Sequence, residues 1–113
     1  MFKRENRLSG KIQFGNANNF STPQFFLKTK DNSLQVNRFA IVVSKKIDKR
    51  AVVRNRIKRI FRSILFDLNK QMIPGHDILL IMRPGITNRT KDEILNLVIN
   101  IFGKTGYMKN LKQ

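Results

Sequence analysis

The residues of this chain that could do chemistry are mainly cations, and residues 45–62 hold the densest group of them. At about 100° per residue of an α-helix, this segment and the residues after it separate into two sides. The apolar side consists of Val53, Ile57, Ile60, Phe61, Ile64, Leu65 and Leu68. The flank beside and opposite it carries Arg54, Asn55, Lys58, Arg59 and Arg62. A guanidinium group matches two phosphate oxygens and an ammonium group adds a mobile charge, so this flank predicts contacts with phosphates.

The same pattern has a simpler explanation, which is a solvated helix surface. Solvated surfaces are often stabilised by acidic residues four positions away from the cations, and this segment lacks such companions. Asn55 lies between Arg54 and Arg56 and lowers helix propensity. It is either a polar contact for a phosphate or sugar, or a residue that the first helical turn tolerates. We favour a binding surface.

Candidates for catalysis by the protein itself are few. A nuclease needs clustered carboxylates for magnesium, or a His with a partner for acid–base chemistry. The single His, His76, is followed by Asp77 in a segment that also contains Pro74 and Gly75. We interpret His76 as a solvated loop residue and Asp77 as a strand-start or turn residue. The sequence therefore predicts no catalytic residue and no metal site in this chain.

The composition favours a polyanionic partner. The chain has 113 residues, enough for one domain, and 23 Lys and Arg against 7 Asp and Glu give a formal net charge of +16. Nucleic acid is the first expectation and an anionic membrane the second, because no apolar run approaches the roughly 20 residues that span a bilayer. There is no Cys, hence no disulfide or thiolate metal site. The charged N-terminus lacks an apolar signal segment, which predicts a cytoplasmic protein.

The elements that must position the cations can be read from hydrophobic patterns. Residues 24–29, 38–44 and 77–82 predict strands, and the apolar 38–44 run is expected at the centre of the sheet. A helix is predicted from about residue 51 to about residue 70, where Pro74 and Gly75 follow its end.

The two ends of the chain are less regular. Leu8, Ile12 and Phe14 predict a short first helix that ends at residues 15–19, with an irregular arm as the alternative. Thr90 and Glu93 have the spacing of a capping box, which opens a last helix. Residues 103–113 are expected to form a frayed basic tail. Together these elements predict a single α+β domain over residues 1–113, with helices packed on one small sheet.

These residues resemble a known family, the protein component of bacterial ribonuclease P. The family's signature, Arg-Asn-Arg opening a basic helix after an Ala-Val pair, is present at residues 51–59. Residues 43–47 and 5–8 are similar as well. The resemblance implies a two-layer α-β-β-β-α-β-α sandwich with a four-stranded sheet and a left-handed βαβ crossover. It also implies that a large RNA subunit catalyses the reaction with magnesium, while the protein helps to bind precursor tRNA and remove its 5′ leader.

The resemblance assigns roles to particular residues. The residues implied to contact the catalytic RNA are Ser44, Lys45, Lys46, Arg54, Asn55, Arg56, Lys58, Arg59 and Arg62. A leader-binding cleft is implied at Phe14, Phe26 and Lys28. Compared with the family, the first helix is several residues shorter, is interrupted at residues 15–16 and lacks a second aromatic one turn on, which leaves Phe20 as the candidate replacement.

Two other classes of protein share some of these features. A basic ribosomal or RNA-assembly protein has similar charge and size, but it does not need the Arg-Asn-Arg helix start after Ser44, Lys45 and Lys46. A DNA-binding regulator predicts a dimer and a short recognition helix after a tight turn, and the sequence favours neither. We therefore expect RNA partners and no binding to DNA or membranes.

Overall fold

The computed structural model describes residues 4–8 and 17–109 and has an α+β architecture, as the sequence predicts. Its strands are β1 (Asn18–Ser21), β2 (Phe25–Asp31), β3 (Arg38–Val42) and β4 (His76–Met82). Its α-helices are α1 (Ala51–Leu68) and α2 (Lys91–Thr105), and short 3-10 helices cover η1 (Arg4–Asn6), η2 (Asn69–Gln71) and η3 (Pro84–Ile86).

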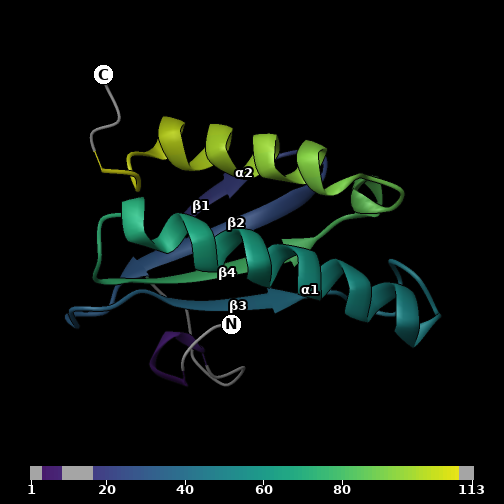
Figure 1. The fold of residues 1–113 in the computed structure, drawn as a ribbon, viewed down its shortest axis with the longest axis horizontal. Coiled ribbons are helices and arrows are strands. Elements are labelled where there is room, and N and C mark those ends of the chain that lie inside the picture. The colour runs from purple at the N-terminus through teal and green to yellow at the C-terminus, as the bar shows by residue number, and fades with distance from the viewer. Residues whose placement is uncertain (1–3, 9–16, 110–113) are drawn as a thin grey trace.

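The four strands form one mixed sheet in the order β1-β2-β4-β3, in which only β3 and β4 are parallel. Both α-helices lie side by side on one face of this sheet (Figure 1). In that view α1 lies in front of the sheet, β3 points to the right and β4 lies above it, which makes the β3–α1–β4 connection left-handed. Such crossovers are rare, because strand twist favours the right-handed form. The expected two-layer arrangement is confirmed.

The position of β3 differs from the sequence-based expectation. It is an edge strand, because β4 inserts between β2 and β3, and Val42 near its end is exposed. The N-terminal segment covers part of this edge, since the Leu8 amide donates to the Phe39 carbonyl over 2.9 Å. An apolar run indicates burial, but here the burial of β3 comes from α1 and the N-terminal segment and not from a strand on each side.

Helix α1 buries the side that the periodicity predicts. Its buried residues are Ile57, Phe61, Ile64, Leu65 and Leu68, and the half-buried Val53 and Ile60 pack against the same core. The ring of Phe61 meets that of Phe25 from β2 edge-to-face, with centroids 5.8 Å apart. Together these buried residues set the rotation of α1 on the sheet and therefore the direction of its cations.

The capping box of α2 is present. The Thr90 hydroxyl accepts from the Glu93 amide and the Glu93 carboxylate accepts from the Thr90 amide.

The expected frayed tail is wrong for residues 103–109. The helix continues to Thr105 and ends at Gly106, whose φ of 87° suits glycine. Tyr107 and Met108 then pack into the core, so nonlocal burial holds a segment that looks polar in sequence; residues 110–113 lie outside the described residues.

The N-terminal region is partly described. Residues 4–6 form the 3-10 helix η1, and Arg7 makes an isolated bridge to Phe39. The predicted first helix through Ile12 and Phe14 lies outside the described residues. Strand β1 is paired along its length with β2, in the segment where the sequence pattern predicts the end of that helix.

Candidate nucleic-acid interface

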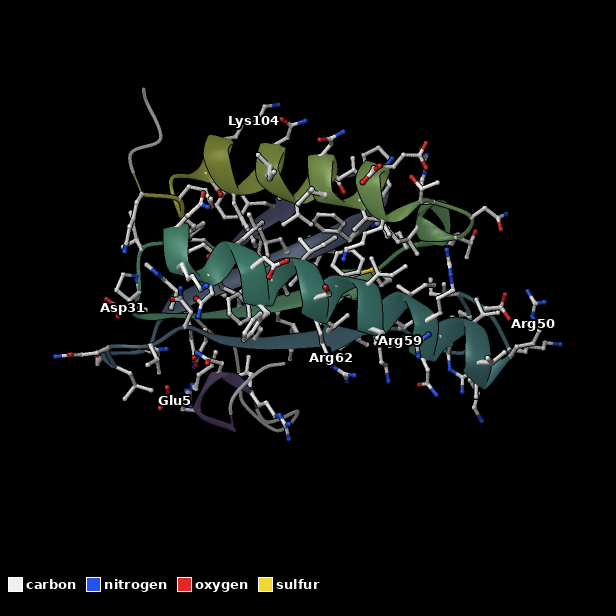
Figure 2. The ribbon with its side chains drawn as sticks, in the orientation of Figure 1. Glu5, Asp31, Arg50, Arg59, Arg62 and Lys104 are labelled. Atoms are coloured by element: carbon white, nitrogen blue, oxygen red, sulfur yellow. The ribbon has the colours of Figure 1, made fainter. Side chains whose placement is uncertain are left out.

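One flank of α1 carries most of the predicted RNA-binding residues. We call it the cationic flank and define it as Arg54, Asn55, Lys58, Arg59 and Arg62. Figure 2 shows Arg59 and Arg62 projecting from α1 on the side away from α2. Asn55, Arg59 and Arg62 are exposed, and Lys58 is half-buried. Among the described residues, Lys58, Arg59 and Arg62 have no ion-pair or hydrogen-bond partner. Their charge is therefore available to an external anion.

Arg54 differs from its neighbours on the flank because it also holds the chain that enters the helix. Its guanidinium donates to the carbonyl oxygens of Asp48 (3.0 Å) and Lys49 (2.8 Å). In the same turn the Arg50 guanidinium and amide bind the Asp48 carboxylate, which lowers the pKa of Asp48 to about 2. Arg50 is thus neutralised within the protein, and Arg54 is only partly available to a partner.

Arg56 does not lie with the other predicted residues. Two positions along a helix correspond to a rotation of about 200°, so Arg56 lies on the side of α1 that faces α2. Its guanidinium donates to the Arg89 carbonyl over 3.5 Å. The Arg-Asn-Arg sequence therefore divides between two sides of α1.

Ser44, Lys45 and Lys46 form the exposed turn that connects β3 with α1. The Ile47 amide closes this turn by donating to the Ser44 carbonyl over 3.0 Å. The connection brings two exposed ammonium groups to the N-terminal end of α1, so the structure extends the cationic flank at that end.

The sheet face opposite the helices carries the second candidate surface. We call it the open face and define it by Phe26 and Lys28 of β2, Leu79 and Ile81 of β4, and Ala40 and Val42 of β3. Paired residues share a face, and the register aligns Phe26 with Ile81 and Val42, and Lys28 with Leu79 and Ala40. Phe26 and Lys28 are half-buried, whereas their neighbours Phe25 and Leu27 are buried on the helix side. The open face therefore has an apolar floor.

Two cations lie beside the Phe26 ring. The Lys28 Nζ is 5.8 Å from the ring centroid and the Arg83 Cζ is 5.9 Å from it. Sequence reasoning missed Arg83, which follows β4 and continues its alternation onto the open face. The only signal for it was the run of alternating positions at residues 77, 79 and 81. An aromatic ring between two cations can stack on a base while the cations contact phosphates.

The other two aromatic candidates do not extend this surface. Phe20 is paired with Leu27, so it lies on the helix side of the sheet, and its ring packs edge-to-face on Tyr107 with centroids 6.2 Å apart. It therefore cannot replace a missing aromatic on the open face. Phe14 lies outside the described residues.

Comparisons with known proteins agree with this arrangement. The family model described as Ribonuclease P matches residues 2–106. A ribonuclease P protein component from Bacillus cereus is 34% identical over 112 residues, covering 98% of this chain and 94% of that protein. The chain belongs to the ribonuclease P protein family. The sequence resemblance is thereby confirmed, and the family match favours it over the ribosomal and DNA-binding alternatives.

Solved ribonuclease P proteins share the fold. The Staphylococcus aureus protein is 25% identical, with a TM-score of 0.82 over 92% of this chain and 98% of that one. The Thermotoga maritima protein is 22% identical, with a TM-score of 0.78 over 87% and 96% of the two chains. The mixed four-stranded sheet with its two packed helices is therefore the architecture of known ribonuclease P proteins.

Asp77 lies at the start of β4, which confirms the strand-start interpretation, but its burial and the packing of His76 were not foreseen. Asp77 is fully buried, and Arg38 binds both of its carboxylate oxygens over 2.7 Å while Asn32 donates over 3.0 Å. Burial raises the Asp77 pKa, but hydrogen bonds from Arg38 and Asn32 and the charges of Arg38 and Lys30 outweigh it, so the pKa lies below the usual value. His76 begins β4 and packs edge-to-face on Tyr107, with centroids 4.9 Å apart. The loop interpretation of His76 is wrong.

Within residues 4–8 and 17–109, no three His, Cys, Asp or Glu side chains come together in a way that could hold a metal ion. Neither α-helix of this described part has the length and hydrophobicity of a bilayer-spanning segment.

Proposed function

We propose that this chain is the cytoplasmic RNA-binding subunit of ribonuclease P and acts as one domain over residues 1–113. In this proposal the cationic flank, with Ser44, Lys45 and Lys46, binds the backbone of the catalytic RNA. Arg56 contributes from the other side of the helix start. The observation that carries the proposal is that Lys58, Arg59 and Arg62 have no partner within residues 4–8 and 17–109, in a chain of this family with a net charge of +16.

The open face is the proposed site for the single-stranded 5′ leader of precursor tRNA. Phe26 would stack on a leader base, and Lys28 and Arg83 would contact the adjoining phosphates. Stacking tolerates any base, because every base has an aromatic face, so this site suits a subunit that meets leaders of different sequence. Phe14 stays part of the proposal through the family resemblance alone.

Cleavage itself is assigned to the RNA subunit, which would use magnesium to stabilise charge at the reacting phosphate. Two of the chain's seven carboxylates support this division of labour. The Asp77 carboxylate is bound on both oxygens by Arg38, and the Asp48 carboxylate is bound by Arg50. Both are engaged in ion pairs within the protein, and residues 4–8 and 17–109 contain no group of His, Cys, Asp or Glu side chains that could hold a metal ion. In this proposal the chain binds and orients RNA.

The test uses holoenzyme reconstituted from the full chain, the cognate RNA subunit and magnesium. The Arg59→Ala change should weaken binding of the RNA subunit and reduce the slope of log affinity against log salt by about 0.7 to 0.9, the equivalent of one phosphate contact. Lys104→Ala is the matched control, because it also removes one exposed cation but lies on α2, away from the flank (Figure 2).

The Lys104→Ala protein should keep the wild-type slope. Equal changes in slope for the two variants would mean that only net charge matters and that the flank is not the interface. Precursor cleavage by the protein without RNA would contradict the assignment of catalysis to the RNA subunit.

A further inference from the structure

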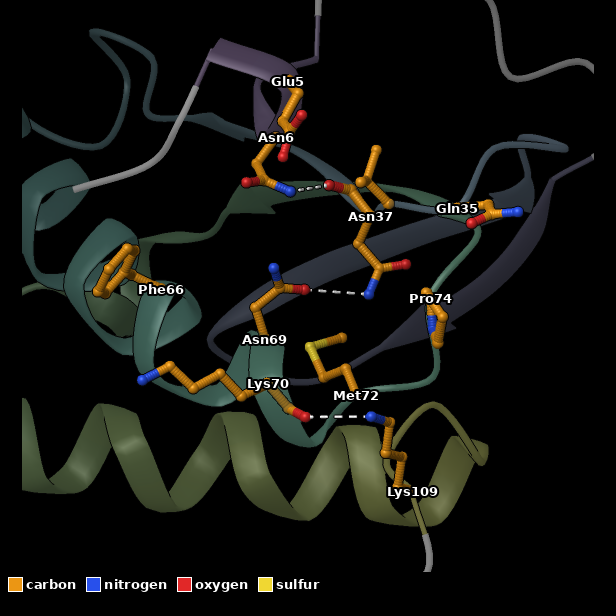
Figure 3. A pocket seen from close by; sticks show the side chains of 11 residues that line it. Glu5, Asn6, Gln35, Asn37, Phe66, Asn69, Lys70, Met72, Pro74 and Lys109 are labelled. Carbon is orange, nitrogen blue, oxygen red and sulfur yellow. Dashed lines mark hydrogen bonds between the residues drawn. The ribbon is translucent and has the colours of Figure 1, made fainter.

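A pocket of about 450 Å³ lies at the C-terminal end of α1, at the opposite end of the helix from Arg54 (Figure 3). Four separate segments build it: η1, the loop before β3, the end of α1 with η2, and the segment after α2. The side chains that matter for its chemistry are Asn6, Asn37, Phe66, Asn69, Lys70 and Lys109. Its volume is within the range of small-molecule sites, and neither the cationic flank nor the open face includes it.

Hydrogen bonds fix the orientation of three amide side chains in the pocket. The Oδ1 of Asn37 accepts from the His76 amide over 2.9 Å, so its Nδ2 must be the group that donates to the Asn69 Oδ1 over 3.2 Å. The Asn6 Nδ2 donates to the Asn37 carbonyl over 2.7 Å. Asn6 and Asn37 are buried, with exposed fractions of 8% and 1%. The network leaves no freedom to exchange the oxygen and nitrogen of these amides.

The remaining atoms of the network face the pocket as one acceptor and one donor. Among the described residues, neither the Asn6 Oδ1 nor the Asn69 Nδ2 has a hydrogen-bond partner. Figure 3 shows both atoms on the side of the amides nearer to Phe66. A ligand that satisfies both atoms must present a donor and an acceptor.

Phe66 supplies a flat apolar wall beside these two atoms. Its side chain is 38% exposed although it is a large aromatic, and it lies on α1 one turn before Asn69 and Lys70. The rim carries two exposed cations, Lys70 and Lys109, and one exposed anion, Glu5. A simple phosphate site would not combine a carboxylate with a neutral donor–acceptor pair and an aromatic wall. Nucleobases do match it, since each has a flat face and a donor next to an acceptor on its pairing edge.

We propose that this pocket binds one unstacked nucleobase of a partner RNA. The base stacks on Phe66, its pairing edge bonds the Asn6 Oδ1 and the Asn69 Nδ2, and Lys70 or Lys109 contacts the adjoining phosphate. The choice of RNA as the source rests on the proposed function and on the net charge of +16. The pocket lies outside the proposed RNA-backbone and leader surfaces, so it adds a third contact that reads a base.

The test is an NMR titration of the full-length protein with adenosine 5′-monophosphate and, separately, with ribose 5-phosphate. The nucleotide should shift the side-chain amide signals of Asn6 and Asn69, and ribose 5-phosphate should leave these two signals in place. Equal shifts with both compounds would reduce the pocket to an anion site and overturn the proposal. Absence of any shift with the nucleotide at millimolar concentration would overturn it as well.

Two variants separate stacking from the hydrogen bonds. Phe66→Leu keeps the apolar side chain but removes the ring, so it should weaken nucleotide binding about 5-fold to 150-fold, whereas Phe66→Tyr keeps the ring and should bind nearly as wild type. In Asn69→Asp the Oδ1 still accepts from Asn37 but the donor is lost. The ligand for this variant is adenosine, because it carries no phosphate that the added carboxylate would repel. The variant should no longer bind it. Wild-type affinity in Phe66→Leu would contradict the proposal.

The same titration distinguishes this inference from the proposed function. Arg59→Ala should bind adenosine 5′-monophosphate with wild-type affinity, because the cationic flank lies apart from the pocket. If Arg59→Ala leaves binding of the RNA subunit unchanged, the proposed function fails while the pocket stands. If the nucleotide titration fails, the pocket is wrong while the flank stands.

Discussion

The cationic flank of α1 and the open face of the sheet both carry Arg and Lys, but they use these charges differently. On the flank, Arg59 and Arg62 have no acidic partner among the described residues. At one end of the open face, Arg38 is bound to the buried Asp77, whereas Lys28 and Arg83 lie beside the Phe26 ring. The flank can therefore give its charge to a partner, whereas part of the charge on the sheet stabilises the fold.

The partners of each cation separate binding cations from structural ones in this strongly basic chain. A count of Lys and Arg does not distinguish Arg38, Arg50 and Arg59. The positions of the acidic residues do, because the two ion pairs of the described residues neutralise Arg38 and Arg50. With 7 acidic residues against 23 basic ones, the carboxylates identify Arg38 and Arg50 as part of the fold, and contacts with carbonyl oxygens add Arg54.

The largest expected effect contrasts the two sides of α1. Phe61→Ala should lower the free energy of unfolding by about 3 to 5 kcal/mol, because Phe61 is fully buried against Phe25 and its loss leaves a cavity. Arg59→Ala should change it by no more than about 0.5 kcal/mol, since Arg59 is exposed. Urea unfolding measures the free energy of unfolding of both variants. If Arg59→Ala lost several kcal/mol of stability, Arg59 would be a structural residue. The cationic flank would then not differ from Arg38 in this respect.

A somewhat smaller effect is expected at Arg38. Arg38→Met should cost about 3 kcal/mol of stability at neutral pH, because the Asp77 carboxylate then stays buried without its charged partner. Asp77→Asn should cost less, since the Arg38 side chain is 29% exposed and can reach water. Urea unfolding of the wild type and of both variants at neutral pH tests whether Arg38→Met loses more stability than Asp77→Asn.

The pH dependence of these proteins sharpens the same comparison. In the wild type the Asp77 pKa is lowered in the folded state, so its stabilisation is present above the unfolded pKa near 3.9 and is lost as pH falls through the folded pKa. In Arg38→Met the burial of Asp77 dominates and raises its pKa, so the stability of the variant relative to wild type should recover as pH falls from 7 to 3. A stability difference that stays constant over this range would show that Arg38 acts by packing alone.

Local patterns account for the parts of the molecule that the sequence predicts well. The buried side of α1 follows from a 3.6-residue period, and the capping box of α2 follows from two residues three positions apart. The direction of Arg59 and Arg62 is a consequence of the same period. These features need no knowledge of which distant segments meet.

Apart from Arg83, the main features that sequence reasoning missed depend on distant contacts. The edge position of β3 depends on the insertion of β4, which has an equally apolar sequence. The burial of Asp77 depends on Arg38, and that of Tyr107 on contacts with Phe20 and His76. Strand β1 is polar in sequence and is defined by its pairing with β2. The amide pocket likewise joins residues that lie more than 30 positions apart.

The smallest expected effect concerns the open face and uses two matched aromatic changes. Phe26→Leu should reduce the preference of the holoenzyme for precursor over mature tRNA, by up to the roughly 1 to 3 kcal/mol that one base–aromatic stack contributes. Phe20→Leu makes the same change on the paired strand, but its ring lies on the helix side against Tyr107. It should therefore alter stability without altering the preference. The measurement is the ratio of the two tRNA dissociation constants for each reconstituted variant, at one salt concentration. Equal preferences in the two variants would mean that the leader does not cross Phe26, and the open face would then serve the sheet alone.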